Sequence, residues 1–185
     1  MGVPPAGTLA SASEGPEGPK LVIVGPPGAG KTTVATLLAE RLGVDVRDTD
    51  ADVEAATGMT VADIFIEKGE SAFRELEEEA VAKALVEHAG VLALGGGAVL
   101  SERTRGALRP HRVVYLEVGL AAAVQRVGLG VGRPLLLGNV RSTLKRLLDE
   151  RAPLYRAVAD ITIKTDGVDP AVVADRVMDQ LRGDA

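Results

Sequence analysis

The feature that most constrains this chain is a glycine-rich segment between a strand-like run and a helix-like run. The apolar run LVIV, residues 21–24, is followed by GPPGAGKTT, residues 25–33, and then by VATLLAERLG. A tight connection between a strand and a helix needs one or two glycines. The geometry of a turn therefore does not account for three glycines and a Lys-Thr pair.

The spacing within this segment matches a phosphate-binding loop. Gly25, Gly30, Lys31 and Thr32 fit the pattern G-x-x-x-x-G-K-[ST]. Glycines let successive backbone N–H groups turn inward around an anion, and the N-terminus of the following helix adds partial positive charge. Lys31 can then reach the terminal phosphates, and the Thr32 hydroxyl can ligate Mg²⁺. The alternative, a glycine-rich turn with a surface lysine, is disfavoured because a strand and a helix flank the motif in the required order.

The rest of the chain continues the alternation of strands and helices. Segments with apolar residues at helical spacing, such as SAFRELEEEAVAKALVEH, separate short runs rich in β-branched residues. The expected strands are Leu21–Val24, Val44–Arg47, Val91–Leu94, Val113–Val118 and Asp160–Lys164. This order predicts βαβ units, and hence an α/β fold whose mostly parallel sheet is covered on both faces.

Length and composition narrow the class of protein. The 185 residues fit one compact domain, and the apolar share of 46% with only 2% aromatic residues implies a core of Val, Leu, Ile and Ala. The net charge of -5 argues against a nucleic-acid partner. No apolar run approaches the roughly 18 residues that span a bilayer. A chain without cysteine suits a reducing compartment, so we expect a cytoplasmic protein with no membrane partner.

Two segments are expected to lie outside the regular elements. Residues 1–20 show no apolar periodicity and lack the basic start and apolar core of a secretory signal, so they are expected to form a flexible tail, with a functional arm as the alternative. Residues 21–185 are then a single domain. Within it, the glycine-rich stretch VGLGVGRPLLLGN, residues 127–139, is interpreted as a mobile loop.

Two aspartates follow the second expected strand, where ligands of open α/β sheets bind. We expect the side chains of Asp48 and Asp50 to point to different sides. One could therefore face a metal ion and the other an acceptor. The alternative is that Thr49 or Asp50 caps a helix that begins near Ala51.

The remaining candidates also have ordinary alternatives. Arg74 lies in the first turns of a helix, where a solvated ion pair with Glu77 or Glu78 is the alternative to a binding role. The three glycines Gly95, Gly96 and Gly97 indicate close approach of a ligand to the backbone, or a tight turn. Solvated surface arginines are the alternative for three further residues, Arg133 in GRPLL and Arg151 and Arg156 in ERAPLYR, a segment expected to follow a helix.

Together these motifs resemble those of the shikimate kinases. GPPGAGKTT, DTD, FRELE, LGGGAV, GRPLL and RAPLYR occur in the order found in that family, from about Leu21 to the last helix. The resemblance implies phosphorylation of shikimate by ATP to shikimate 3-phosphate, in chorismate and aromatic amino acid biosynthesis. It also implies a three-layer P-loop fold with a five-stranded parallel sheet, a lid at about 127–139, a substrate-binding region at about 49–77, and a monomer.

The resemblance further implies roles for individual residues. Asp50 would orient the accepting hydroxyl and take its proton, and Arg133 would be the lid arginine that reaches the phosphates. Mg²⁺ would be held by Thr32 and, through water, by Asp48. ATP would contact Gly28, Ala29, Gly30, Lys31, Thr32, Thr33, Arg126, beside the adenine, and Arg133. Shikimate would contact Asp50, Arg74, Gly96, Gly97 and Arg151.

The acceptor distinguishes this interpretation from its rivals. A carboxylate substrate needs fork-shaped cationic partners, and Arg74 and Arg151 supply two. A gluconate kinase or a nucleoside-monophosphate kinase on the same scaffold is the nearest alternative. A nucleotide-dependent switch without an acceptor is another, although a GTP switch should carry an N-K-x-D segment and this chain has none.

Overall fold

The computed structural model describes residues 18–128 and 139–184, so nearly all of the expected lid, with Arg133, and residues 1–17 of the expected tail lie outside the described residues. The strands are β1 (Leu21–Val24), β2 (Val46–Asp48), β3 (Val91–Ala93), β4 (Val113–Glu117) and β5 (Ile161–Lys164). The helices are α1 (Lys31–Leu42), α2 (Thr49–Thr57), α3 (Val61–Glu87), η1 (Ala98–Leu100), α4 (Glu102–Leu108), α5 (Leu120–Gly128), α6 (Val140–Val158) and α7 (Pro170–Gly183).

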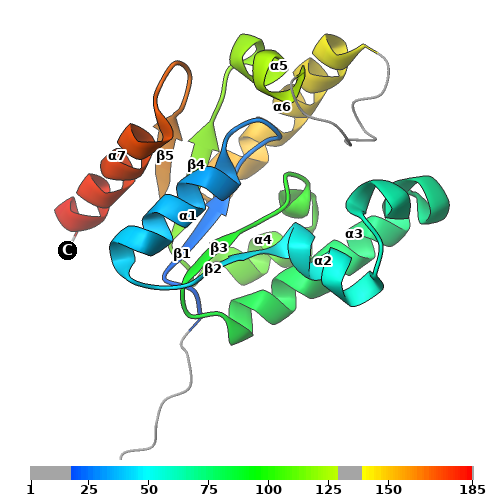
Figure 1. Cartoon of the computed structure of the whole chain (residues 1–185), viewed down its shortest axis with the longest axis horizontal. Helices are drawn as coiled ribbons and strands as arrows, with labels where there is room; N and C mark the ends of the chain where they lie inside the picture. Colours follow the sequence, from blue (N-terminus) through cyan, green and yellow to red (C-terminus); the bar gives the residue numbers. More distant parts are fainter. Residues whose placement is uncertain (1–17, 129–138, 185) are drawn as a thin grey trace, which may run out of the picture.

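The five strands form one parallel sheet in the order β2-β3-β1-β4-β5, which confirms the expected fold class (Figure 1). The first expected strand has the same bounds as β1, and the other four expected strands are present with bounds that differ by one or two residues. The largest shift is at β2, which begins at Val46 rather than Val44. Because the strands are parallel, their carboxyl ends share one edge. The loops after β1, β2 and β3 therefore meet there.

The two faces of the sheet carry two separate cores. Leu21 and Ile23 of β1 pack with residues of α1, α6 and α7, whereas Val22 and Val24 pack with α3, α4 and Tyr155. This alternation follows from the period of two in a strand. Because both faces are covered, all four residues of β1 are buried, as is typical of the central strand of a parallel sheet. The central strand is thus a rigid base for the loop that follows it.

A third, smaller core lies between α2 and α3, which Figure 1 shows beside the sheet. Its buried residues are Val53, Ile64 and Phe73. Within α3 the backbone leaves the helical conformation at Gly69, with φ 85° and ψ 169°, so α3 consists of two helical segments. The left-handed φ explains the glycine at this position. The second segment carries Arg74.

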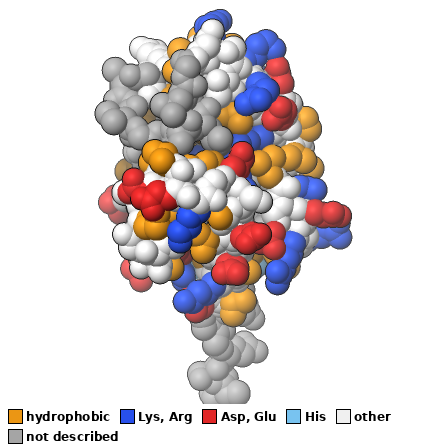
Figure 2. Space-filling model, turned by 90° about the vertical axis from the view of Figure 1, so that its right-hand side faces the viewer, with side chains coloured by type: hydrophobic (Ala, Val, Ile, Leu, Met, Phe, Trp, Pro, Cys, Tyr) orange, Lys and Arg blue, Asp and Glu red, His pale blue; other side chains and the backbone are white. Residues whose placement is uncertain are grey.

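The surface and the chain start add three observations. No helix within residues 18–128 and 139–184 is long and apolar enough to cross a bilayer. On the face drawn in Figure 2, acidic and basic side chains are interspersed. Residues 18–20, the end of the expected tail, lie against the domain, because the Lys20 N–H donates a hydrogen bond to the Gly90 carbonyl at 2.8 Å.

Candidate functional site

The loop between β1 and α1 has the backbone expected of an anion-binding loop. Gly28 and Gly30 have φ values of 81° and 83°, which favour glycine. Gly30 is the N-cap of α1, and no described side chain caps that helix. The first N–H groups of α1 are therefore left for a ligand, and the helix dipole favours an anion.

Side chains from two other elements hold this loop. Lys31 Nζ donates a hydrogen bond to the Pro26 carbonyl at 3.0 Å, so the lysine lies across the loop. Arg126 of α5 donates to the Gly28 carbonyl at 3.0 Å and to the Thr165 carbonyl at 2.7 Å. The guanidinium of Arg126 therefore joins the phosphate-binding loop to the segment after β5. That position is next to the loop at which ATP is expected.

Asp48 connects the first and second loops. Its Oδ2 accepts a hydrogen bond from Thr32 Oγ1 at 3.1 Å, and its Oδ1 accepts one from the Asp50 N–H at 2.9 Å. Asp48 is thus the N-cap of α2, which begins at Thr49. The alternative, a cap at Thr49 or Asp50, is wrong, because Asp48 is the cap. The expected extended chain ends at Asp48, since Asp50 already lies in the helix.

The oxygen atoms of Thr32 and Asp48 fit a hard divalent cation such as Mg²⁺. No group of three or more Asp, Glu or His side chains that could hold a metal ion is present in the described part of the chain. An ion at this place would therefore take its other ligands from phosphate and water, as is usual for Mg²⁺.

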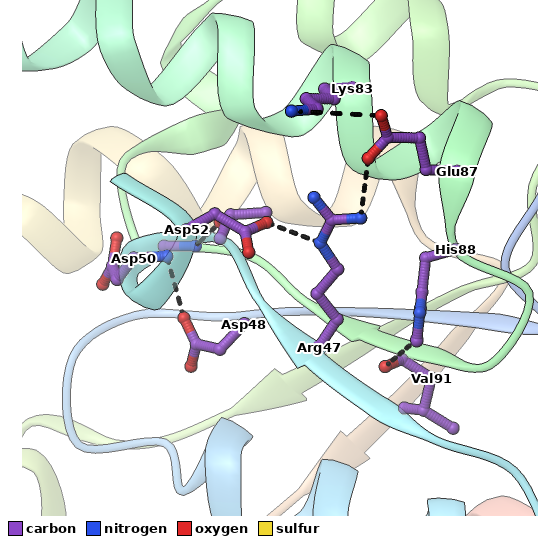
Figure 3. Close-up of polar contacts among 10 residues, drawn as sticks. Arg47, Asp48, Asp50, Asp52, Lys83, Glu87, His88 and Val91 are labelled. Atoms are coloured by element: carbon purple, nitrogen blue, oxygen red, sulfur yellow. Dashed lines mark hydrogen bonds and ion pairs between the residues drawn. The ribbon is translucent and has the colours of Figure 1, made fainter. Parts of the chain in front are cut away.

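An ion-pair network next to Asp48 fixes α2 to α3 (Figure 3). Arg47 Nε lies 2.7 Å from Asp52 Oδ2, and Arg47 Nη1 lies 3.2 Å from Glu87 Oε2. Hydrogen bonds and charge from Asp52 and Glu87 raise the pKa of Arg47 despite partial burial. The first turn of α2, which includes Asp50, is therefore anchored from the strand that precedes it.

The three consecutive glycines after β3 are packed against charged side chains. A Cβ atom at Gly95 would lie 2.5 Å from both Asp50 Oδ1 and Glu77 Oε1, and one at Gly97 would lie 1.9 Å from Arg74 Nη1. A Cβ at Gly96 would lie 3.2 Å from Pro27 Cδ of the phosphate-binding loop. Close approach of these side chains therefore explains the glycines. The alternative, a tight turn, is also present, because the Ala98 N–H donates a hydrogen bond to the Gly95 carbonyl at 3.1 Å. Approach of a ligand stays a prediction.

Arg74 lies in a mixed aromatic and acidic environment. Its Nη1 lies 2.7 Å from Glu77 Oε2, and its guanidinium carbon lies 5.8 Å and 5.3 Å from the ring centres of Phe65 and Phe73. The Glu77 side chain is only 3% exposed. Burial raises the pKa of Glu77, although Arg74 opposes the shift. The ion pair with Glu77 that was the alternative for Arg74 is therefore present, but it is not a solvated pair, because the acidic partner is buried.

Arg151 is a buried arginine on α6. The residue is 3% exposed, and its Nε has no hydrogen-bond partner among the described residues. The segment ERAPLYR was expected to follow a helix. It lies instead within α6, with Pro153 inside the helix. Arg151 is therefore not a solvated surface arginine. Arg156 is one, because its side chain is 58% exposed and forms an ion pair with Glu117 at 2.5 Å.

A groove of about 710 Å³ borders the cluster formed by Arg74, Glu77 and the glycine loop after β3. It is lined by residues of α3, η1 and α4, and Arg74, Glu77 and Gly97 are among them. Five glutamates and two arginines line it, so the groove is acidic overall. Solvent therefore reaches the Arg74 side of the cluster through a groove whose negative charge would repel free anions.

Four residues of the site escaped the sequence analysis: Glu77 as a buried group, and Phe65, Phe73 and Tyr155. The chain has two phenylalanines, two tyrosines and no tryptophan. The phenylalanines form one pair beside Arg74, and the tyrosines, Tyr115 and Tyr155, form the other. The scarcity of aromatic residues was the available signal for the three aromatic side chains. A chain with only four aromatic residues is expected to use them where large, rigid side chains are needed.

The expected site residues meet at one edge of the sheet, with Arg133 outside the described residues. The chain matches the family model described as shikimate kinase over residues 27–182. A shikimate kinase of Salinispora arenicola is 62% identical over 84% of this chain and 93% of its own length, and one of Thermobifida fusca is 57% identical over 88% and 95%. A solved shikimate kinase of Acinetobacter baumannii, in complex with shikimate, superposes with a TM-score of 0.87 at 37% identity, covering 90% of this chain and 94% of that one. The chain therefore belongs to the shikimate kinase family.

Proposed function

We propose that this enzyme transfers the γ-phosphoryl group of ATP to the 3-hydroxyl of shikimate, giving shikimate 3-phosphate and ADP. The observation that carries the proposal is the contact between the two halves of the site. Gly96, in the expected acceptor loop, packs against Pro27 of the phosphate-binding loop. An acceptor bound there lies next to the phosphates, as in-line transfer requires.

On the ATP side, the backbone of residues 28–33 binds the phosphates, and Lys31 neutralises charge that develops on the transferred group. Arg126 lies against the adenine, next to the carbonyls of Gly28 and Thr165 that already hold its guanidinium. Arg133 of the lid completes the charge neutralisation when the site closes. This closure also keeps water away from the γ-phosphate.

On the acceptor side, Arg74 and Arg151 pair with the shikimate carboxylate, and Gly96 and Gly97 form the surface against which the ring lies. Asp50 orients the accepting hydroxyl and takes its proton as the new P–O bond forms and the bond to the β-phosphate oxygen breaks. The buried carboxylate of Glu77 holds Arg74 at 2.7 Å, which supports a fixed guanidinium position. Preorganised cations are what recognition of a small anion needs.

We also propose Mg²⁺ as the metal ion, held by Thr32 and, through water, by Asp48. Their oxygens lie 3.1 Å apart, which places two suitable donors at the mouth of the phosphate-binding loop. When bound, the ion withdraws charge from the phosphates. Asp48 has a second task, because it also caps α2 and so sets the position of Asp50.

A cytoplasmic, monomeric enzyme that binds neither nucleic acid nor membranes completes the proposal. The cysteine-free sequence supports the location. The described large apolar side chains that are exposed are spread over β2, α3, η1 and α7, which supports a surface without one dominant apolar patch. Light scattering coupled to size-exclusion chromatography tests the monomer.

A coupled assay of ADP release tests the reaction. The acceptors are shikimate, gluconate and a set of nucleoside monophosphates, each with ATP and Mg²⁺. Of these acceptors, we expect only shikimate to give ADP release. Preference for gluconate or a nucleotide would contradict the proposed acceptor, and ATP binding without turnover of any acceptor would favour a nucleotide-dependent switch.

A further inference from the structure

Tyr155 joins the helix that carries Arg151 to the loop of three glycines. It follows Arg151 by one helical turn on α6, and its hydroxyl donates a hydrogen bond to the Gly96 carbonyl at 2.5 Å. Arg151 lies close enough to Tyr155 to oppose the shift of the tyrosine pKa. One side chain therefore connects two parts of the proposed acceptor site that are far apart in sequence.

The position of this hydroxyl is fixed by the core. Tyr155 is fully buried, and its ring stacks on Tyr115 of β4 with the ring centres 5.0 Å apart and the planes at 24°. Burial raises the pKa of Tyr155 far above its ordinary value, so the hydroxyl stays protonated and remains a donor. A ring packed in this way can fix the position of the Gly95–Gly97 loop relative to the sheet.

Gly96 has little freedom on its other sides. The site of its missing Cβ faces Pro27 at 3.2 Å, and the neighbouring Gly97 faces the guanidinium of Arg74. A shift of the Gly96 peptide would therefore change both the gap to the phosphate-binding loop and the space beside Arg74. The hydrogen bond from Tyr155 opposes such a shift.

We propose that Tyr155 is a positioning residue for acceptor binding, which acts by holding the Gly96 carbonyl and thereby the surface against which the acceptor lies. The inference rests on the proposed function, because it names a residue that shapes the proposed shikimate site. Tyr155 does not touch the acceptor in this scheme. Its effect passes through the Gly95–Gly97 loop, which contacts the phosphate-binding loop and Arg74 but leaves the N–H groups of α1 unchanged.

The test is the substitution Tyr155→Phe, which keeps the ring and its stacking and removes only the hydroxyl. We expect the KM for shikimate to rise about tenfold, which corresponds to about 1.4 kcal/mol, while the KM for ATP changes by less than about twofold. The matched control is Tyr115→Phe, which removes a hydroxyl from the other ring of the same stack. The charged neighbours of that hydroxyl are Glu117 and Arg156 rather than groups of the site, so both KM values should stay unchanged.

Calorimetric titration of each folded variant with shikimate separates positioning from stability. A weakened shikimate affinity for Tyr155→Phe alone, at a temperature well below unfolding, supports the proposal. Unchanged shikimate affinity with a lower midpoint of unfolding would overturn it, because the hydrogen bond would then be structural only. Equal rises of both KM values would overturn it as well. Absence of shikimate turnover in the unsubstituted enzyme would instead refute the proposed function.

Discussion

The two halves of the site are built in different ways. The proposed phosphate side is a stretch of consecutive residues whose backbone N–H groups would bind the anion, supported by one helix N-terminus. The acceptor side is assembled from α2, α3, the loop after β3 and α6, and its groups are side chains held by one another. The first half depends on local conformation, whereas the second depends on packing between distant segments.

This difference determines how each half fails. A loop of backbone N–H groups should lose function when its one charged side chain is replaced, while its geometry is retained. A cluster of partly buried ionic groups is coupled, because removing one partner leaves another charge or polar atom unpaired. Substitutions on the acceptor side should therefore alter several properties together.

The largest effect is expected on the phosphate side. Lys31→Ala should lower turnover about 10³-fold, because the ammonium group offsets charge in the transition state. Circular dichroism and the midpoint of thermal unfolding should be nearly unchanged, since Lys31 is only partly buried. Near-normal turnover by the folded variant would remove the basis for a kinase mechanism at this loop.

The acceptor arginines should give the next largest effect. Arg74→Ala and Arg151→Ala are each expected to cost about 2–5 kcal/mol of shikimate binding, or roughly 30- to 5,000-fold in affinity, with ATP affinity little changed. Arg156→Ala is the matched control, since it lies on the same helix as Arg151 but is exposed. If titration calorimetry gives the same shikimate affinity for all three variants, the acceptor side has been placed wrongly.

The two aspartates test the boundary between the halves. Asp50→Asn should lower kcat on the order of 100-fold, through loss of the group that orients the hydroxyl and takes its proton, with the Mg²⁺ dependence unchanged. Asp48→Asn keeps a capping residue for α2 but should raise the Mg²⁺ concentration for half-maximal activity about tenfold. Superimposable Mg²⁺ titrations of the two variants would show that this division of roles is wrong.

The smallest effect concerns the pH dependence of stability at Glu77. Because burial raises its pKa, the folded state binds more protons than the unfolded state between the ordinary value of 4.5 and the raised value. Stability from this group therefore rises as the pH falls through that window. The unfolding free energy of the native enzyme should increase relative to that of Glu77→Gln over the same range, as urea titrations at several pH values would measure. A constant difference would mean that Glu77 is not perturbed.

Local patterns predicted the fold and the phosphate side. The alternation of strands and helices gave the five strands of the parallel sheet, because each strand is a short buried run between turn signals. Gly28 and Gly30 have the left-handed backbone that the motif requires. Errors arose at boundaries, as at α2, where Asp48 rather than Thr49 or Asp50 is the cap. Several Asx and Thr residues in a row each satisfy a capping rule, and only the helix start decides between them.

The acceptor side could be predicted only through the resemblance. Helical spacing puts Glu77 on the same face of α3 as the buried Phe73 and Val81, but its charge favoured a position in solvent. Likewise, ERAPLYR was expected to follow a helix but lies within α6, where the exposed Pro153 stands between the buried side chains of Arg151 and Tyr155. Contacts between segments that are far apart in sequence leave no local periodicity to detect.

The small separate core of Val53, Ile64 and Phe73 has a consequence for how such enzymes diverge. Its residues pack with one another and with partly buried neighbours from α2 and α3, while the two larger cores cover the sheet. Substitutions there can accumulate without repacking the strands, and the helical break at Gly69 gives the segment its own junction within α3. If the proposed acceptor site lies here, a change of acceptor would need substitutions in this small core and its loops, while the two cores that cover the sheet stay the same.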